Sequence, residues 1–259
     1  MRSRQASRRR RGLWGRPALS LEEPEHTSAR PAVYGAATLL ERLAARYQFD
    51  ETTVQVAGRA WAVLGPDDPD SLIDVIPPND DDRLPYWAQL WPSGQVLAEA
   101  ILTAAAFDGQ RVLELGCGLG LTAAAALVAG ADLLAVDCEP DALDFAAYNA
   151  QMLAGVPLYS RLGNWRGPDP IAWLEPPFDV VLAADVLYER RDVAPLADLV
   201  PRLLSPGGWL WLAEPRREAG GLFVKLLRGA GWADEVQSVP FEGLGQRLVI
   251  DLHRLSPPR

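Results

Sequence analysis

A glycine-rich turn carries the clearest chemical signal in this sequence. It follows the apolar run 111–115 and consists of Gly116, Cys117, Gly118, Leu119 and Gly120. Glycines let a chain turn tightly and let backbone N–H groups approach a ligand closely. Position 121 is a leucine, so the spacing departs from the G-x-G-x-x-G pattern of nicotinamide and flavin sites. An NAD-dependent oxidoreductase is therefore disfavoured, although similar turns occur in many α/β proteins.

Two acidic residues accompany this turn at positions that suit a nucleoside cofactor. Glu114 lies two positions before the first glycine, where its carboxylate can meet an ammonium group. Asp137 ends the next apolar run, 17 residues after Gly120, and can accept hydrogen bonds from both hydroxyls of a ribose. S-adenosylmethionine carries both a ribose and an ammonium. The order of strand, loop, helix, strand and acid therefore indicates an S-adenosylmethionine site.

The elements that must position these residues alternate between helix and strand from about residue 93 onward. Ser93 is expected to cap a helix over 95–106. Strands are predicted at 111–115, 132–136, 157–162, 178–183, 209–213, 235–239 and 246–252, with helices at 120–129, 140–152, 192–204 and 219–230. Strands separated by helices form right-handed crossovers and a mostly parallel sheet. The last two strands, joined only by a loop, predict an antiparallel hairpin at one edge.

The residues before this region have a different character. Residues 1–30 are Arg-rich, without an apolar period, and predict a disordered tail. A helix is expected over 31–48, and two alternating runs at 53–56 and 60–64 predict a hairpin. A polar segment at 77–82 ends this part. We therefore expect a tail (1–30), an accessory helix and hairpin (31–84) and a main α/β domain that carries the cofactor site (85–259).

The glycine turn with Glu114 and Asp137 resembles the corresponding region of class I S-adenosylmethionine-dependent methyltransferases, and the likeness extends over about 90–255. This resemblance implies a Rossmann-like, doubly wound α/β fold. Its seven-stranded sheet would have the order 3-2-1-4-5-7-6, with strand 7 antiparallel. The expected final hairpin agrees with that order.

Four further segments are similar to the seven-β-strand protein-lysine methyltransferases, and particularly to the branch that acts on the β-subunit of electron-transfer flavoprotein. They are the D-x-x-Y of Asp185–Tyr188, the W-A-x-x-W-P-x-G-Q of Trp87–Gln95, Asn164-Trp165, and the turn Glu214-Pro215-Arg216. The branch has a D-P-x-R-like turn at the last place, so Glu214 departs from the pattern. Methyltransferases of nucleic-acid base amines carry (D/N)-P-P-(Y/F) after the fourth strand, which this chain lacks there.

Carried over residue by residue, the resemblance implies cofactor contacts and an acceptor site. The cofactor contacts are Trp91, Gly116, Gly118, Asp137, Trp165 and Ala184, to which we add Glu114, Cys117 and Gly120 of the turn. Asp185 and Tyr188 would lie where cofactor and acceptor meet. An Asp beside a lysine favours the charged amine, so Asp185 is expected to capture and orient the acceptor rather than deprotonate it.

Charge and composition limit the partners. The net charge is −9, and because residues 1–16 carry seven arginines and no acid, the remainder sums to about −16. Such a body disfavours nucleic acid and favours a cationic partner, such as a protein with an exposed lysine. The sequence shows no membrane span, metal-ligand spacing or disulfide framework, so a cytoplasmic monomer is expected. A small-molecule amine N-methyltransferase and a non-catalytic S-adenosylmethionine-binding module remain as alternatives.

Overall fold

The structure, a computed structural model, describes residues 34–75, 84–104, 107–167 and 174–258. The predicted disordered tail over 1–30 and the polar segment at 77–82 lie outside the described residues. In the described part, no helix combines the length and the apolar character that crossing a membrane requires.

Seven strands form one sheet in the order β5-β4-β3-β6-β7-β9-β8. The strands are β3 (Arg111–Leu115), β4 (Asp132–Asp137), β5 (Tyr159–Leu162), β6 (Phe178–Ala184), β7 (Leu204–Glu214), β8 (Ala233–Gly243) and β9 (Gln246–Ser256). The first five are parallel, whereas β9 runs antiparallel to both of its neighbours. Counted from β3, this is the order 3-2-1-4-5-7-6 with strand 7 antiparallel, so the predicted fold class is confirmed.

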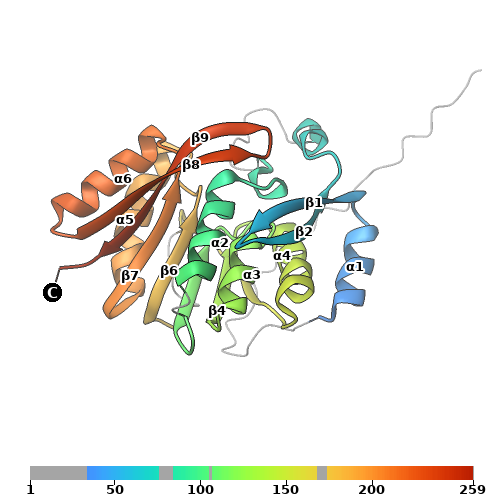
Figure 1. Cartoon of the computed structure of the whole chain (residues 1–259), viewed down its shortest axis with the longest axis horizontal. Coiled ribbons are helices and arrows are strands. Elements are labelled where there is room, and N and C mark those ends of the chain that lie inside the picture. Colours follow the sequence, from blue (N-terminus) through green and yellow to red (C-terminus); the bar gives the residue numbers. More distant parts are fainter. Residues whose placement is uncertain (1–33, 76–83, 105–106, 168–173, 259) are drawn as a thin grey trace, which may run out of the picture.

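Helices cover both faces of the sheet (Figure 1). One layer consists of α2 (Pro92–Ala104), α3 (Leu121–Val128) and α4 (Pro140–Ala154), and the other of α5 (Val193–Leu203) and α6 (Glu218–Gly229). Because the parallel strands lie between two layers, β3 is buried from Val112 to Leu115 rather than alternating between buried and exposed residues. Alanines along α3 are fully buried, and their small side chains let this helix pack closely on its neighbours. The short 3-10 helices are η1 (Asp70–Val75), η3 (Tyr86–Ala88) and η4 (Arg190–Asp192).

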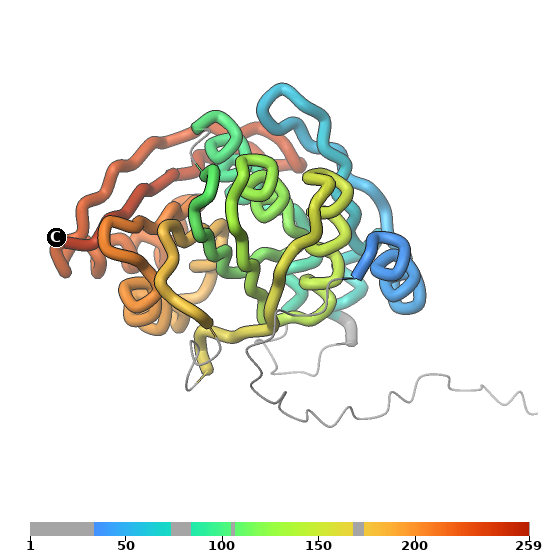
Figure 2. The backbone as a smooth tube through the Cα atoms, turned by 90° about the horizontal axis from the view of Figure 1, so that it is seen from below, coloured from blue at the N-terminus to red at the C-terminus, as the bar shows by residue number. Residues whose placement is uncertain are grey.

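The N-terminal elements pack beside α4 and α2, and the first helix lies at the opposite end of the molecule from the C-terminus (Figure 2). They are helix α1 (Ala36–Ala44) and the antiparallel strands β1 (Phe49–Val56) and β2 (Arg59–Pro66). The predicted hairpin is therefore confirmed. Its two-residue turn, Ala57-Gly58, has positive φ at both positions, as a tight hairpin turn requires. The apolar face of the hairpin belongs to the same core as α2, α3 and α4.

Several element ends differ from the sequence prediction. Helix α2 begins at Pro92, so the expected capping role of Ser93 is wrong. Pro92 suits the first helical position because its missing N–H would have no partner there. Strand β7 begins at residue 204 rather than 209, and β8 and β9 each have 11 residues. The sequence hides these extensions because Pro-Gly-Gly at 206–208 is typical of a turn, and most residues of β8 are exposed.

Candidate active site

A cleft lies at the carboxyl ends of β3, β4 and β6, where the order of the parallel strands reverses. Open α/β sheets bind ligands at this position. The loops after these strands supply one side of the cleft, and the segment before α2 supplies the other. Its lining residues are Leu84, Tyr86, Trp87, Trp91, Gly116, Gly118, Asp137, Cys138, Glu139, Trp165, Ala184, Asp185, Val186 and Tyr188.

The glycine turn brings backbone to the floor of the cleft. Gly116 and Gly118 have φ values of 70° and 50°, in the left-handed region that glycine adopts without strain. A Cβ at Gly116 would lie 2.8 Å from Val186, so the close approach requires a glycine. Gly120 has a different role, because a Cβ there would lie 2.6 Å from the Cα of Ala146 in helix α4. The third glycine permits helix packing rather than lining the cleft.

Glu114 lies beneath the glycine turn as a buried carboxyl group with an unused oxygen. It is 2% exposed, and its Oε2 has no hydrogen-bond partner in the structure. Burial, reinforced by the nearby charge of Asp137, raises the pKa of Glu114 well above its ordinary value. A buried carboxyl of this kind favours a cationic ligand group within hydrogen-bonding range.

Asp137, at the end of β4, accepts hydrogen bonds from the backbone of the surrounding loops. Its Oδ2 accepts a hydrogen bond from the Gly118 N–H at 2.9 Å, and its Oδ1 accepts one from the Glu139 N–H at 3.1 Å. Burial raises the pKa of Asp137, while these backbone donors oppose that shift. Each carboxylate oxygen can accept more than one hydrogen bond, so the cleft-lining side chain retains the capacity to bind hydroxyl groups.

Trp165 forms a buried wall of the cleft rather than an exposed aromatic on a loop. Its Nε1 donates to Asp192 at 2.7 Å, and its ring lies within 4 Å of the position that a Gly116 Cβ would occupy. Asp192 is fully buried and also accepts hydrogen bonds from the Arg166 guanidinium. The carboxylate, paired with this cation, holds the indole in one orientation.

Asp185 follows β6 in a strained backbone conformation, with φ of 57°. A non-glycine residue in this region is uncommon and often marks a functional site. Its N–H donates to the Ala213 carbonyl on β7 at 3.0 Å, which holds the bend. The Ser93 hydroxyl donates to Oδ2 at 3.3 Å, and the Arg217 guanidinium donates to Oδ1 at 3.0 Å. The carboxylate is 4% exposed.

Aromatic rings form the wall of the cleft beside Asp185. The ring centroids of Tyr86 and Tyr188 are 4.5 Å apart, and Trp91 contacts Tyr86 edge-on. The Trp91 Nε1 also donates to the Tyr86 carbonyl at 2.7 Å, which fixes the indole. Burial raises the pKa of Tyr188 far above its ordinary value, so its hydroxyl stays protonated. Cys138 is exposed, and partial desolvation together with the nearby charges of Asp137 and Glu139 raises the pKa of its thiol to about 12.

The structure brings most of the predicted site residues together. Those that line the cleft are Trp91, Gly116, Gly118, Asp137, Trp165, Ala184, Asp185 and Tyr188. Glu114, Cys117 and Gly120 lie outside this lining. Sequence reasoning missed the contacts of Ser93 and Arg217 with Asp185. The only available signal was the Glu214-Pro215-Arg216 turn, since Arg217 is the residue that follows it.

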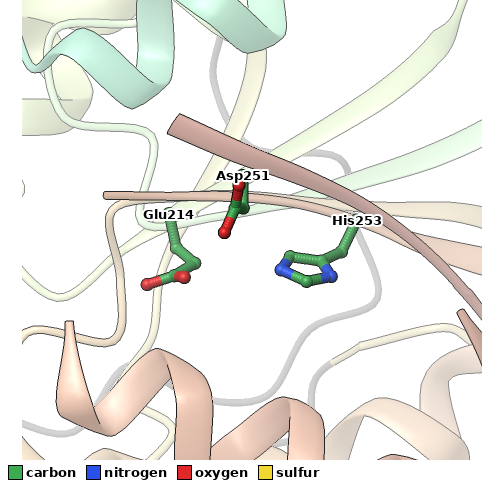
Figure 3. Close-up of side chains that lie close together, drawn as sticks. All are labelled: Glu214, Asp251 and His253. Atoms are coloured by element: carbon green, nitrogen blue, oxygen red, sulfur yellow. The ribbon is translucent and has the colours of Figure 1, made fainter. Parts of the chain in front are cut away.

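The turn after β7 is anchored on the α6 side of the sheet. Glu214, Asp251 and His253 offer three possible metal-ligand atoms within 4.8 Å of one another, and their side chains gather in one place (Figure 3). The protein's own donors already engage the carboxylates: Arg216 pairs with Asp251, and the Arg217 N–H donates to Glu214 at 2.9 Å. We therefore interpret the cluster as an anchor for the turn.

The length of Glu214 fits this anchoring role. A Cβ at Gly220 would lie 2.2 Å from the Glu214 carboxylate, so the glycine in α6 makes room for the longer acid. The glutamate that stands here in place of the family's aspartate is thus accommodated by Gly220. The anchored turn fixes the backbone of Arg217 opposite Asp185.

The fold and the cleft define a class I S-adenosylmethionine-dependent methyltransferase. A family model described as lysine methyltransferase matches residues 81–230, and the chain belongs to this family. The chain is also similar to a magnesium protoporphyrin IX methyltransferase from Synechocystis PCC 6803, solved with bound S-adenosylmethionine. That likeness has 17% identity and a TM-score of 0.52, and it covers 73% of this chain and 97% of the other. The match to this methyltransferase family supports S-adenosyl-L-methionine as the cofactor.

Among characterised proteins, the chain is similar to two electron transfer flavoprotein beta subunit lysine methyltransferases. The one from Danio rerio is 36% identical over 108 residues, which cover 41% of this chain and 40% of the relative. The one from Xenopus laevis is 36% identical over 136 residues, which cover 51% of this chain and 53% of the relative. The matched region thus spans about half the length of these relatives.

Proposed function

We propose that this protein transfers a methyl group from S-adenosylmethionine to the ε-amino group of a lysine in a protein acceptor. The observation that carries the proposal is the position of the D-x-x-Y segment: Asp185 and Tyr188 line the cleft beside the glycine turn. The likeness to two lysine methyltransferases over about half their length supports the choice of acceptor.

The residues around the glycine turn fit the cofactor. We assign the free Glu114 oxygen to its ammonium group and the Asp137 carboxylate to its ribose hydroxyls. Gly116 and Gly118 let backbone approach it, and Trp165 packs behind the turn. When bound, the cofactor supplies an electrophilic methyl group on a positively charged sulfur.

The protein contributes alignment and desolvation to the transfer. Displacement at a methyl carbon requires the amine in line with the breaking bond, and holding two reactants in this geometry contributes much of the rate. Tyr86, Tyr188 and Trp91 form an apolar wall that excludes water and guides an extended side chain. The amine must be uncharged to react, whereas an unperturbed lysine has a pKa of about 10.4.

Neither polar group at the acceptor site is suited to remove the proton. Tyr188 keeps its own proton because its pKa is raised. Asp185 is already paired with Arg217, and its side-chain partners among the described residues, Arg217 and Ser93, both donate hydrogen bonds to it. Its proposed role is to orient the amine through hydrogen bonding.

Labelling identifies the acceptor. A lysate from cells that lack this protein is incubated with tritiated S-adenosylmethionine and the purified protein, and the labelled species are then isolated. We expect label on lysine residues of a protein. Label confined to a small molecule would favour the alternative amine N-methyltransferase, and absence of transfer would favour a binding module.

Substitutions then test the site. We expect Asp185→Asn and Tyr188→Phe to lower methyl transfer by about a hundredfold, the effect of misplacing reacting groups, with cofactor affinity unchanged by calorimetry. Asp198→Asn and Tyr148→Phe, which lie on α5 and α4 away from the cleft, are the matched controls. Full activity in both site variants would refute the assignment.

A further inference from the structure

The carboxylate assigned to the acceptor site already has a cation beside it. Both Nε and Nη2 of Arg217 lie within hydrogen-bonding distance of Asp185 Oδ1, at 3.0 and 2.9 Å. The Ser93 hydroxyl donates a hydrogen bond to the other oxygen, Oδ2, at 3.3 Å. Each oxygen of this carboxylate therefore has one donor residue before any acceptor arrives.

The position of Arg217 is built into the fold. Its backbone N–H is held by Glu214, and its guanidinium lies 5.8 Å from the centroid of the Trp91 ring, within cation-π range. The preceding residue, Arg216, is fixed by its ion pair with Asp251 on β9. The side chain of Arg217 is 38% exposed, so one side of it remains open to solvent.

This pairing changes the electrostatics that an incoming amine meets. An unpaired Asp185 would attract an ammonium group and hold it charged, which opposes methyl transfer. The Asp185–Arg217 pair is neutral overall, and so is the buried Asp192–Arg166 pair behind Tyr188. The other titratable groups that line the cleft are Tyr86, Asp137, Cys138, Glu139 and Tyr188. Glu114, Glu189 and Glu214 lie outside the lining, and Glu114 and Asp137 are assigned to the cofactor.

We propose that Arg217 is a positioning residue that neutralises Asp185, so that the acceptor lysine binds and reacts as the uncharged amine. This inference rests on the proposed function. With its charge balanced, Asp185 can still accept a hydrogen bond from the amine N–H. The guanidinium and the positively charged sulfur of the cofactor both disfavour a third positive charge between them. The proton of the amine is then lost to solvent before transfer.

Binding of a lysine mimic tests the charge state directly. Butylamine is titrated into the protein loaded with S-adenosylhomocysteine, and its affinity is measured by calorimetry between pH 7 and pH 10.5. In the wild type, affinity should rise with pH as the uncharged amine becomes abundant. In Arg217→Gln, the unpaired Asp185 should bind butylammonium about tenfold more tightly at pH 7, equivalent to about one pKa unit of the bound amine. Affinity in that variant should no longer rise with pH.

The rate of transfer gives a second readout. Tritium incorporation into the knockout lysate is measured against pH for the wild type, Arg217→Gln, Arg217→Lys and the exposed control Arg202→Gln. The Gln variant should be about tenfold slower at neutral pH and recover at high pH, a shift of about one unit in the profile. Arg217→Lys should restore the wild-type profile because it retains the positive charge, and the control should match the wild type.

The outcomes separate the two proposals. An equal loss of rate at every pH would make Arg217 merely structural and overturn the inference. A faster Arg217→Gln variant at neutral pH would also overturn it, because Arg217 would then compete with the ammonium group. If the wild type labels no lysine at any pH, the proposed function itself fails.

Discussion

Glu114 occupies a position where stability and cofactor binding make opposite demands. Its carboxyl group is buried within the sheet, and one oxygen lacks a hydrogen-bond partner in the structure. A buried carboxylate without a counter-charge costs free energy, and the raised pKa is the expression of that cost. Glu114 is therefore expected to destabilise the protein without cofactor and to contribute favourably only when a cation lies beside it.

Replacing Glu114 with glutamine should therefore raise the stability of the free protein and lower its affinity for the cofactor. Without cofactor, Glu114→Gln should raise the melting temperature at neutral pH by about 3 °C or more. The same variant should bind S-adenosylmethionine about tenfold more weakly, because a charge-assisted hydrogen bond to the ammonium is lost. Calorimetry and thermal melting measure both effects, with exposed Asp132→Asn on β4 as the control. A less stable variant with unchanged affinity would contradict the assignment.

The destabilising effect of the Glu114 carboxylate should also appear in the pH dependence of the protein's stability. A carboxyl whose pKa is raised in the folded state retains its proton there while the unfolded chain loses it, so stability falls as pH rises above the ordinary value of 4.5. The decline stops once pH passes the raised folded pKa. The difference in melting temperature between Glu114→Gln and the wild type should thus widen from pH 5 to pH 8 and narrow when cofactor is added. A constant difference would exclude this cause.

At the scale of elements, the loops after β3 and β4 lie side by side because helices α3 and α4 approach each other closely. Gly120 is the contact point, with φ of 81° and no room for a Cβ against Ala146. Gly155, at the end of α4, has a similar φ of 72° but open space around it. An alanine at Gly155 would introduce backbone strain alone, whereas an alanine at Gly120 would introduce both backbone strain and a steric overlap.

Alanine at these two positions should give different results. Gly155→Ala should cost about 1–2 kcal/mol, the strain of a left-handed L-residue. Gly120→Ala adds an overlap with α4, so we expect a total of about 3 kcal/mol or more. It should also weaken cofactor binding, since the turn must shift. Urea unfolding compares the variants, and equal losses would show that the packing of α3 on α4 does not limit the turn.

Sequence reasoning located the elements well where periodicity and turn chemistry agree, as in β3 and its glycine turn. It failed where a feature depends on tertiary contacts. Ser93 is a residue type that often caps helices, yet its hydroxyl donates a hydrogen bond to Asp185, 92 residues away in the sequence. Only the Glu214-Pro215-Arg216 turn before it distinguishes Arg217 from 23 other arginines in the chain. Its role depends on the bend at Asp185, which only the folded backbone reveals.

At the scale of the molecule, the N-terminal hairpin shares the core of the methyltransferase sheet. Val56 and Val63 are buried in the same cluster as α2, α3 and α4. The buried side chain of Asn149 in α4 joins the parts: it accepts a hydrogen bond from the Leu64 N–H and donates to the carbonyls of Leu64 and Leu119. The hairpin is thereby tied to the loop that enters α3.

Removing the amide should therefore affect more than the hairpin. Asn149→Leu leaves three buried backbone groups without partners, which we expect to cost about 3 kcal/mol or more. Asn149→Asp, which retains the acceptor but loses the donors, should be intermediate near neutral pH. Hydrogen exchange and urea unfolding should show the hairpin and the sheet opening together. A separate early transition of the hairpin would contradict a shared core.

The bond between Leu64 and Asn149 also has a consequence for the newly made chain. Its two partners are 85 residues apart, and translation at 5–20 residues per second takes roughly 4 to 17 s to cover that distance. A lone two-stranded hairpin is marginal in water. The apolar faces of β1 and β2 thus leave the ribosome well before α4 exists to cover them. This interval is the period in which the nascent protein most needs a chaperone.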